Sequence, residues 1–164
     1  MSAISDMAAV MAKEAYSVGV PAVLLFGLPT RKVGFGSRAW AKDGAVQRAT
    51  REIKNARPEV CVICDTCLCE YTDHGHCGVI KNNIVDNDAT LTQYVQMAVA
   101  QANSGARVVG PSGMMDGQVA AIRAGLDAAG HSDVIIMAYT AKYASAFFGP
   151  FREAVGSSLR GDRR

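Results

Sequence analysis

The chain has 164 residues, of which 49% are hydrophobic and 20% charged, and its formal net charge is +2. This length suits one domain with a sizeable core, and the composition is that of a soluble globular protein. So small a charge argues against nucleic acid or an anionic membrane as a partner.

The amino-terminal stretch does not look like a targeting signal. Residues 1–20 place Asp6, Lys13 and Glu14 where a signal peptide would be apolar. No apolar run approaches the roughly 20 residues needed to cross a bilayer. We therefore expect a cytoplasmic protein. Its cysteines should stay reduced, and their odd number, five, suits a disulfide framework poorly.

Four short apolar runs predict β-strands. Each is rich in Val, Ile and Leu, as expected of strands that are buried on both faces. A glycine precedes three of the runs, at a position where a helix would end in a left-handed cap. The runs are residues 21–26, 59–64, 107–110 and 133–138, and the glycines are Gly19, Gly105 and Gly130.

Apolar residues at helical spacing lie between these runs. One stripe extends from Met7 to Val18, another from Leu91 to Ala102, and a third from Val119 to Ala129. Asn87 and Asp88 are candidate caps of the second helix. The predicted order, α-β-α-β-α-β-α-β-α, implies a parallel sheet with right-handed crossovers.

Two architectures fit this order: an open doubly wound sheet and part of a (β/α) barrel. The first usually carries a glycine-rich nucleotide loop, and neither G-x-G-x-x-G nor G-x-x-x-x-G-K-[ST] is present. Polar and reactive residues instead follow three successive strands, in CDTCLC, PSGMMDG and TAKYAS, which is typical of a barrel. Four strands are half of the eight that a barrel needs.

The loop CDTCLCEYTDHGHCGV, residues 64–79, concentrates four cysteines and two histidines. Three of the cysteines have the spacing C-x-C-x7-C, which differs from the paired C-x2-C of a structural zinc knot. Three thiolates would leave a fourth position open, as in a catalytic zinc site, and soft thiolates favour zinc over magnesium or calcium. The alternative is that they are buried apolar groups. These cysteines are Cys67, Cys69 and Cys77.

Two further pairs in this region have a less specific signal. His74 and His76 could complete the metal shell or donate hydrogen bonds to its ligands. Cys61 and Cys64 are interpreted as small apolar core residues. Strand alternation points them to opposite faces, which argues against a joint redox role for this C-x2-C pair.

Three stretches resemble the porphobilinogen synthase family, also called the 5-aminolevulinate dehydratases. DTCLCEYTDHGHCG is similar to its zinc loop, and PSGMMDGQVAAIRAGLDAAG to the helix after its fourth strand. IMAYTAKYASAFFGPFREAVGSSLRGDRR resembles the segment with its Schiff-base lysine. The resemblance implies a (β/α)8 TIM barrel of roughly twice this length. Residues 1–164 would form one partial barrel domain of about four βα units, strands two to five.

The resemblance also implies the chemistry. The family condenses two molecules of 5-aminolevulinate to porphobilinogen, with loss of two waters. Lys142 matches one Schiff-base lysine, while no stretch matches the second. Cys67, Cys69 and Cys77 match the ligands of a Zn²⁺ that polarises or positions a substrate. An additional Mg²⁺ belongs to the full-length family fold.

Other matched residues would bind the substrate. Arg152 and Arg163 match residues that hold its carboxylate, for which a guanidinium has a suitable geometry. Asp65 and Ser112 match polar residues of the pocket. The family usually assembles as homo-octamers, so a homo-oligomer is expected.

The sequence departs from the family pattern at two of these stretches. Gly113 stands where many members have an aspartate, and Thr140 replaces a common serine. Met114 and Met115 are interpreted as packing residues, and Asp116 as a helix cap.

Two other functions compete with this one. The chain could be a truncated, non-catalytic zinc-binding or assembly protein derived from the same family. A generic class I aldolase would explain Lys142 but not the cysteine loop.

Overall fold

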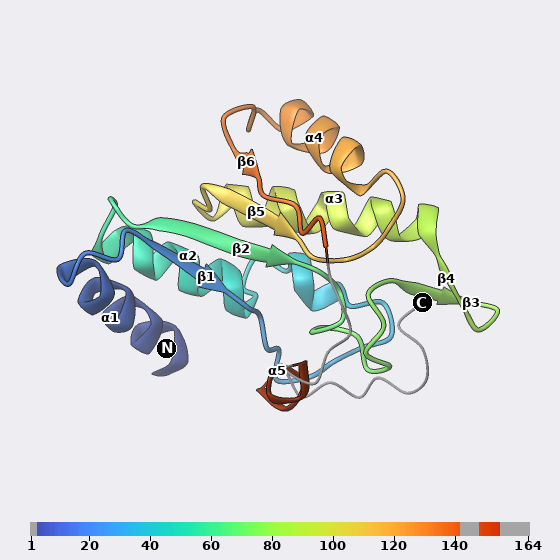
Figure 1. Ribbon diagram of the computed structural model, residues 1–164, viewed down its shortest axis with the longest axis horizontal. Coiled ribbons are helices and arrows are strands. Elements are labelled where there is room, and N and C mark those ends of the chain that lie inside the picture. Colours follow the sequence, from blue (N-terminus) through green and yellow to red (C-terminus); the bar gives the residue numbers. More distant parts are fainter. Residues whose placement is uncertain (1–2, 142–147, 155–164) are drawn as a thin grey trace.

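A four-stranded parallel sheet forms the centre of the computed structural model, which describes residues 3–141 and 148–154 (Figure 1). The strands lie in the order β1-β2-β5-β6, so neighbours in the sheet follow one another along the chain. Each crossover between them carries a helix, as the alternating sequence pattern predicts. The strands are β1 (Ala22–Leu25), β2 (Cys61–Thr66), β5 (Val108–Pro111) and β6 (Ile135–Ile136).

Helices and a small hairpin complete the described part of the chain. A 3₁₀ turn, Ser37–Trp40, lies between β1 and the first crossover helix. An antiparallel hairpin follows the cysteine loop and leads into the next helix. The helices are α1 (Ala3–Ser17), α2 (Ala45–Ala56), α3 (Asn87–Asn103), α4 (Gln118–Ala128) and α5 (Phe148–Ala154), and the hairpin strands are β3 (Val79–Lys81) and β4 (Ile84–Asp86).

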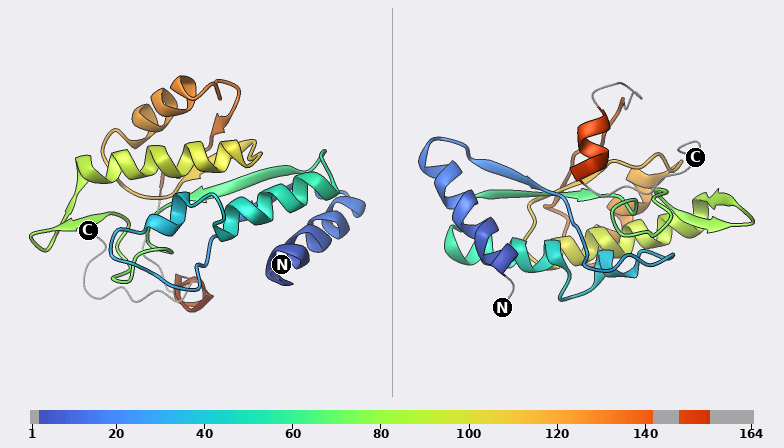
Figure 2. Two further views of the ribbon diagram at one scale, coloured as in Figure 1. Left: turned by 180° about the vertical axis from the view of Figure 1, so that it is seen from behind. Right: turned by 90° about the horizontal axis from the view of Figure 1, so that it is seen from below.

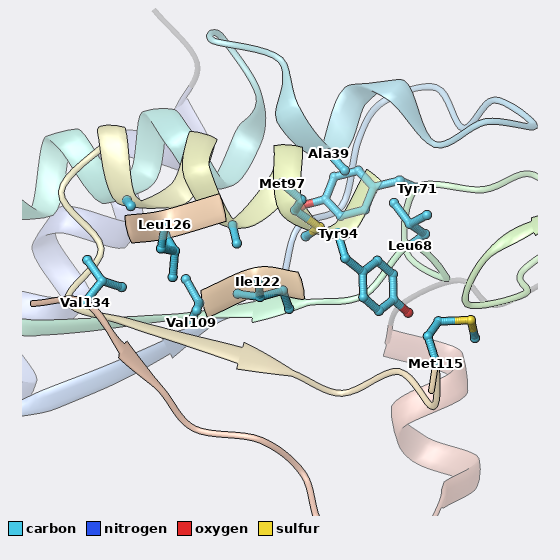
Figure 3. Close-up of a cluster of buried hydrophobic side chains, with 12 residues drawn as sticks. Ala39, Leu68, Tyr71, Tyr94, Met97, Val109, Met115, Ile122, Leu126 and Val134 are labelled. Atoms are coloured by element: carbon cyan, nitrogen blue, oxygen red, sulfur yellow. The ribbon is translucent and has the colours of Figure 1, made fainter. Parts of the chain in front are cut away.

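Two apolar clusters hold the helices on the sheet. One lies between α3, α4 and β5 and includes Tyr94, Met97, Val109, Ile122 and Leu126 (Figure 3). The other lies beneath α1 and α2 and includes Ile53, Val62 and Cys64 among its buried members. Burying a Leu- or Ile-sized side chain contributes about 1.5–3 kcal/mol, so these clusters fix the helices against one face of the sheet.

The opposite face of the sheet is covered unevenly by the described residues. The prediction of strands buried on both faces holds for the central strand β5, whose four residues are all buried, and is wrong for the edge strands β1 and β6. Leu24, Ile135 and Met137 are exposed. In the right-hand view of Figure 2, α2 and α3 lie on one side of the strands, and only α5 lies on the other. A side chain in a parallel strand is buried on both faces only if layers cover both, as in a closed barrel or a doubly wound sheet.

The glycine signals in the sequence predicted helix ends correctly. Gly19, Gly105 and Gly130 all have a positive φ, of 91°, 101° and 82°. They follow α1, α3 and α4, and each precedes the next strand. The left-handed backbone at these positions has a low steric cost only for glycine.

Other local predictions need correction. The apolar stripe Met7–Val18 is mostly exposed, because α1 packs on the second cluster through small residues such as Ala8 and Ala12. The cap of α3 is Asp86, whose side chain accepts from the Ala89 N–H, and not Asn87 or Asp88. The predicted order included a helix between the first two strands but gave it no residues, and the β3–β4 hairpin was not assigned from the sequence.

The start of α4 also differs from expectation. Gly117 is its N-cap residue, and Asp116 makes no side-chain cap hydrogen bond there. Of the two methionines interpreted as packing residues, Met115 is buried, but Met114 is exposed. No helix in the described ranges has the length and apolar character needed to span a membrane.

Candidate active site and metal centre

The carboxyl ends of β2 and β5 place Asp65 and Ser112 in contact. Asp65 is paired with Gly110 in the parallel register, and Ser112 directly follows β5. The Ser112 hydroxyl and the Asp65 carboxylate lie 3.0 Å apart, and both residues are buried. The parallel sheet thus brings together two of the predicted substrate-binding residues, 47 positions apart in the chain.

A buried glutamine on α3 holds the end of β2 in place. The Gln101 side-chain amide donates to the Asp65 carbonyl at 2.7 Å, and its amide oxygen accepts from the Thr66 hydroxyl at 2.8 Å. Both groups of the amide are therefore satisfied in a buried position. Sequence reasoning missed Gln101, although a polar residue on the buried stripe of a predicted helix is a recognisable signal.

The cysteine loop folds so that three thiols converge. The Sγ atoms of Cys67, Cys69 and Cys77 all lie within 4.8 Å of one another, and the Cys67–Cys69 pair is 3.4 Å apart. Zinc–sulfur bonds of about 2.3 Å in a tetrahedron require sulfurs about 3.8 Å apart. The three thiols therefore fit a zinc-sized ion with one open coordination position, and the predicted ligand set is brought together.

The electrostatics of this cluster also favour a cation. For Cys67, the hydrogen bond with Cys69 lowers the pKa, but the hydrogen bond with Cys77 and burial outweigh it and raise the pKa to about 12. Hydrogen bonds with Cys67 and Cys77, together with burial, raise the pKa of Cys69 further. Three thiolates so close together repel one another, and a bound divalent cation would remove that penalty.

The first of the two histidines, His74, makes hydrogen bonds through both ring nitrogens. The His74 ring accepts from the His76 N–H through Nδ1 at 3.1 Å, and its Nε2 lies 3.1 Å from the Gly34 carbonyl. Nε2 must carry the proton to donate to that carbonyl, so both ring nitrogens are engaged. His74 therefore links the cysteine loop to the segment after β1.

The second histidine lies beside the first. The Nδ1 atom of His76 is buried without a hydrogen-bond partner, and its ring centroid is 5.5 Å from that of His74. Burial, and secondarily His74, lower the pKa of His76, which favours the neutral ring. Within the described ranges, the cysteine trio forms a metal-ligand group without either histidine.

Glu70 and Tyr71 are further residues of the site that sequence reasoning missed. The Glu70 carboxylate is buried and accepts from the Gly27 N–H at 2.7 Å. Burial, with the nearby Asp65 and Cys67, raises the pKa of Glu70 well above its ordinary value. A Cβ at Gly27 would lie 1.7 Å from the Tyr71 hydroxyl, so the end of β1 is fitted closely to this loop.

The remaining two cysteines are separated, as their spacing in the strand predicts. Cys64 is fully buried, whereas Cys61 is half-buried and lines a cavity of about 470 Å³ at the opposite end of β2. The interpretation as a buried apolar residue thus holds for Cys64 and only partly for Cys61. Burial raises the pKa of Cys64 to about 12, although its hydrogen bond with Thr50 acts in the other direction.

Native thiol labelling should distinguish these two cysteines. With the metal site loaded, we expect iodoacetamide at pH 8 to modify Cys61 at least about 100-fold faster than Cys64, because alkylation needs an accessible thiolate. Peptide mass spectrometry after a time course measures both rates. In denaturant the two rates should converge, and equal rates in the native chain would contradict the burial described above.

Three of the predicted site residues lack described side chains. Lys142 and Arg163 lie outside the described residues. Arg152 belongs to α5, and nothing is described of its side chain. Thr140, just before Lys142, is exposed after the end of β6. The roles of Lys142, Arg152 and Arg163 stay predictions, as do those of Asp65 and Ser112.

Comparison with known proteins identifies the family. A sequence model of the family described as delta-aminolevulinic acid dehydratase matches residues 2–164. The chain belongs to the delta-aminolevulinic acid dehydratase family. This confirms the resemblance on which the predicted site residues depend.

Individual relatives show how much of the family's length is present. The chain is 60% identical over 157 residues to delta-aminolevulinic acid dehydratase of Mycobacterium tuberculosis, a match that covers 93% of this chain and 48% of the relative. It is 54% identical over 152 residues to the protein of the same name from Halalkalibacterium halodurans, covering 92% and 46%. The chain therefore spans about half the length of these curated relatives.

A solved structure from the same family confirms the fold. Delta-aminolevulinic acid dehydratase (porphobilinogen synthase) of Toxoplasma gondii, in complex with the reaction product porphobilinogen, matches with a TM-score of 0.91 and 38% identity. The match covers 96% of this chain and 46% of that one. Of the two architectures considered, the chain therefore has that of the (β/α)8 barrel family, as a partial barrel. That residues 1–164 act as one domain stays a prediction.

Proposed function

We propose that this chain supplies the metal-binding side of a porphobilinogen synthase, which condenses two 5-aminolevulinate molecules with loss of two waters. The convergence of the three thiols beside the Asp65–Ser112 pair carries the proposal. Family membership supports it, because most of this chain's own length aligns with the family. No observation favours the non-catalytic alternative.

Zinc is the metal that the donor set favours. Three thiolates select a soft or borderline ion, and they leave one position for a substrate oxygen or water. Bound there, zinc would supply Lewis-acid polarisation of a substrate carbonyl. Cys67, Cys69 and Cys77 would hold it, and Asp65 and Ser112 lie close enough in the fold to offer an acceptor and a donor to the same substrate. The Mg²⁺ of the full-length family fold stays a prediction.

Lys142 is proposed to bind one substrate covalently. Its neutral amine attacks the ketone carbon of 5-aminolevulinate, a C–N bond forms, and the ketone oxygen leaves as water. The resulting Schiff base makes the neighbouring carbons more acidic, which prepares the substrate for condensation. Arg152 and Arg163 are proposed to hold the substrate carboxylate through charge-assisted hydrogen bonds. A homo-oligomer, an octamer by family resemblance, is proposed for the complete enzyme.

Borohydride trapping tests the role of Lys142. In a full-length protein that contains these 164 residues, reduction in the presence of 5-aminolevulinate should leave a stable adduct on the Lys142 peptide. Lys54 offers an internal control, because its ammonium donates to the Pro58 and Val60 carbonyls at the far end of the sheet. Lys142→Arg should abolish that adduct. Labelling confined to other lysines in the unmodified protein would remove the role proposed for Lys142.

A further inference from the structure

Tyr94 connects helix α3 to the metal-binding loop. Its ring is fully buried, and Figure 3 shows its hydroxyl directed toward the end of the apolar cluster where Leu68 and Met115 lie. The hydroxyl donates to the Cys77 carbonyl at 2.7 Å and lies 3.9 Å from the Cys67 sulfur. One phenol therefore meets two of the three ligand residues, which are ten positions apart in the chain.

This contact matters because Cys77 lies near the carboxyl end of the cysteine loop, ten residues after Cys67. The neighbouring backbone is held on both sides, by the Thr72 hydroxyl on the His76 carbonyl at 2.9 Å and by the Thr90 hydroxyl on the Val79 N–H at 3.0 Å. The bond from Tyr94 acts on the backbone of the ligand residue itself. It therefore contributes to where the third sulfur lies relative to Cys67.

Gly113 leaves the space that Tyr94 occupies. A Cβ built at Gly113 would lie 1.9 Å from the Tyr94 hydroxyl oxygen and less than 3 Å from two ring carbons. The backbone of Gly113 does not itself require glycine, because its φ is outside the left-handed range. The closeness of the phenol is thus the physical reason for glycine at this position.

The turn around Gly113 cannot easily shift to make room. The buried Gln118 side chain donates to the Gly113 carbonyl at 3.0 Å and accepts from the Met115 N–H at 3.2 Å. Both bonds would have to be lost or lengthened if the turn moved away from α3. A side chain at position 113 would therefore displace the Tyr94 ring and, with it, the hydroxyl.

We propose that Tyr94 and Gly113 act as a matched pair, in which Gly113 gives the phenol its place and the phenol holds Cys77 and Cys67 in ligand geometry. Tyr94 is thus a positioning residue for the metal site, and the inference rests on the proposed metal-binding function. It also explains the departure at Gly113, since an aspartate there would collide with Tyr94. Groups that orient ligands typically change metal affinity by about 10–100-fold.

Metal titration of the full 164-residue chain tests the pair. Zinc affinity is measured by competition with a chromophoric chelator, and the ligand geometry by the absorption spectrum of the Co²⁺-substituted chain. Tyr94→Phe keeps the ring and removes only the hydroxyl. We expect zinc affinity to fall by about 10–100-fold and the thiolate–cobalt bands to shift. Tyr16→Phe, a remote tyrosine stacked under Arg57, should change neither.

A double-mutant cycle tests the coupling between the two residues. Gly113→Ala should weaken zinc binding by about 10-fold or more when Tyr94 is present, and by less than about 2-fold when Tyr94→Leu has removed the ring. Circular dichroism of each variant reports whether the fold is retained, and Tyr94→Phe remains informative if the Gly113 variants unfold.

The possible results separate the two hypotheses. An unchanged affinity and cobalt spectrum for Tyr94→Phe would overturn the inference, and so would an equal Gly113→Ala effect in both backgrounds. If the unmodified chain binds neither zinc nor cobalt, the proposed metal-binding function fails first, and the inference fails with it.

Discussion

Cys69→Ala should weaken zinc binding by about two orders of magnitude or more. The thiol of Cys69 lies 3.4 Å from that of Cys67 and within 4.8 Å of that of Cys77, so its removal takes one of three protein ligands away. Structural zinc sites bind with about 10–16 kcal/mol over four ligands, which is about 3 kcal/mol per ligand. A loss of this size corresponds to about a hundredfold in affinity. Competition titration on the purified chain measures it.

Cys61→Ala is the matched control for this experiment. Cys61 is the first residue of β2, whose other end leads into the cysteine loop. It lines the cavity at the end of β2 away from the three thiols. We expect its zinc content to stay at about one ion per chain, and the site should also accept cadmium or lead, as soft thiolates do. Equal zinc content in the Cys61→Ala and Cys69→Ala chains would contradict the assigned ligands.

The 164-residue chain by itself is expected to form no measurable porphobilinogen. The described residues contribute four parallel strands, whereas a closed barrel has eight. Leu24 and Ile135 are exposed on the sheet face that the other half of a closed barrel would cover, so the described residues do not supply the opposite wall of such a barrel. Errors of about 1 Å in the position of reacting groups can cost about a hundredfold in rate. The family resemblance matches Lys142 to one of two Schiff-base lysines and gives the second no match, and losing one member of a catalytic unit removes most of its activity.

A colorimetric assay for the pyrrole product, with zinc and 5-aminolevulinate present, measures this turnover. A full-length family member serves as the positive control. Turnover by the 164-residue chain that disappears in Lys142→Ala would contradict the expectation, because it would mean that the chain assembles a complete site, for example from two copies.

Patterns within short segments were enough to predict much of the fold and the clustering of the candidate metal ligands. The alternation of apolar runs with helical stripes predicts the parallel order of the strands, and Gly19, Gly105 and Gly130 indicate where helices end. These signals are readable because periodicity and left-handed caps depend on neighbouring residues alone. The cysteine spacing likewise points to one site, since all three thiols belong to one loop.

Contacts between distant segments could not be predicted in the same way. No local pattern shows that Tyr94 reaches the Cys77 carbonyl, that the Gly27 N–H binds Glu70, or that α1 turns Met7 outward. The sequence shows that Gly113 departs from the family pattern, but its cause is visible only when β5 and α3 are packed together. Such contacts depend on how the crossovers place one helix against the next strand. For this reason the candidate ligand residues were readable in the sequence, while the residues that contact them emerged only from the packed chain.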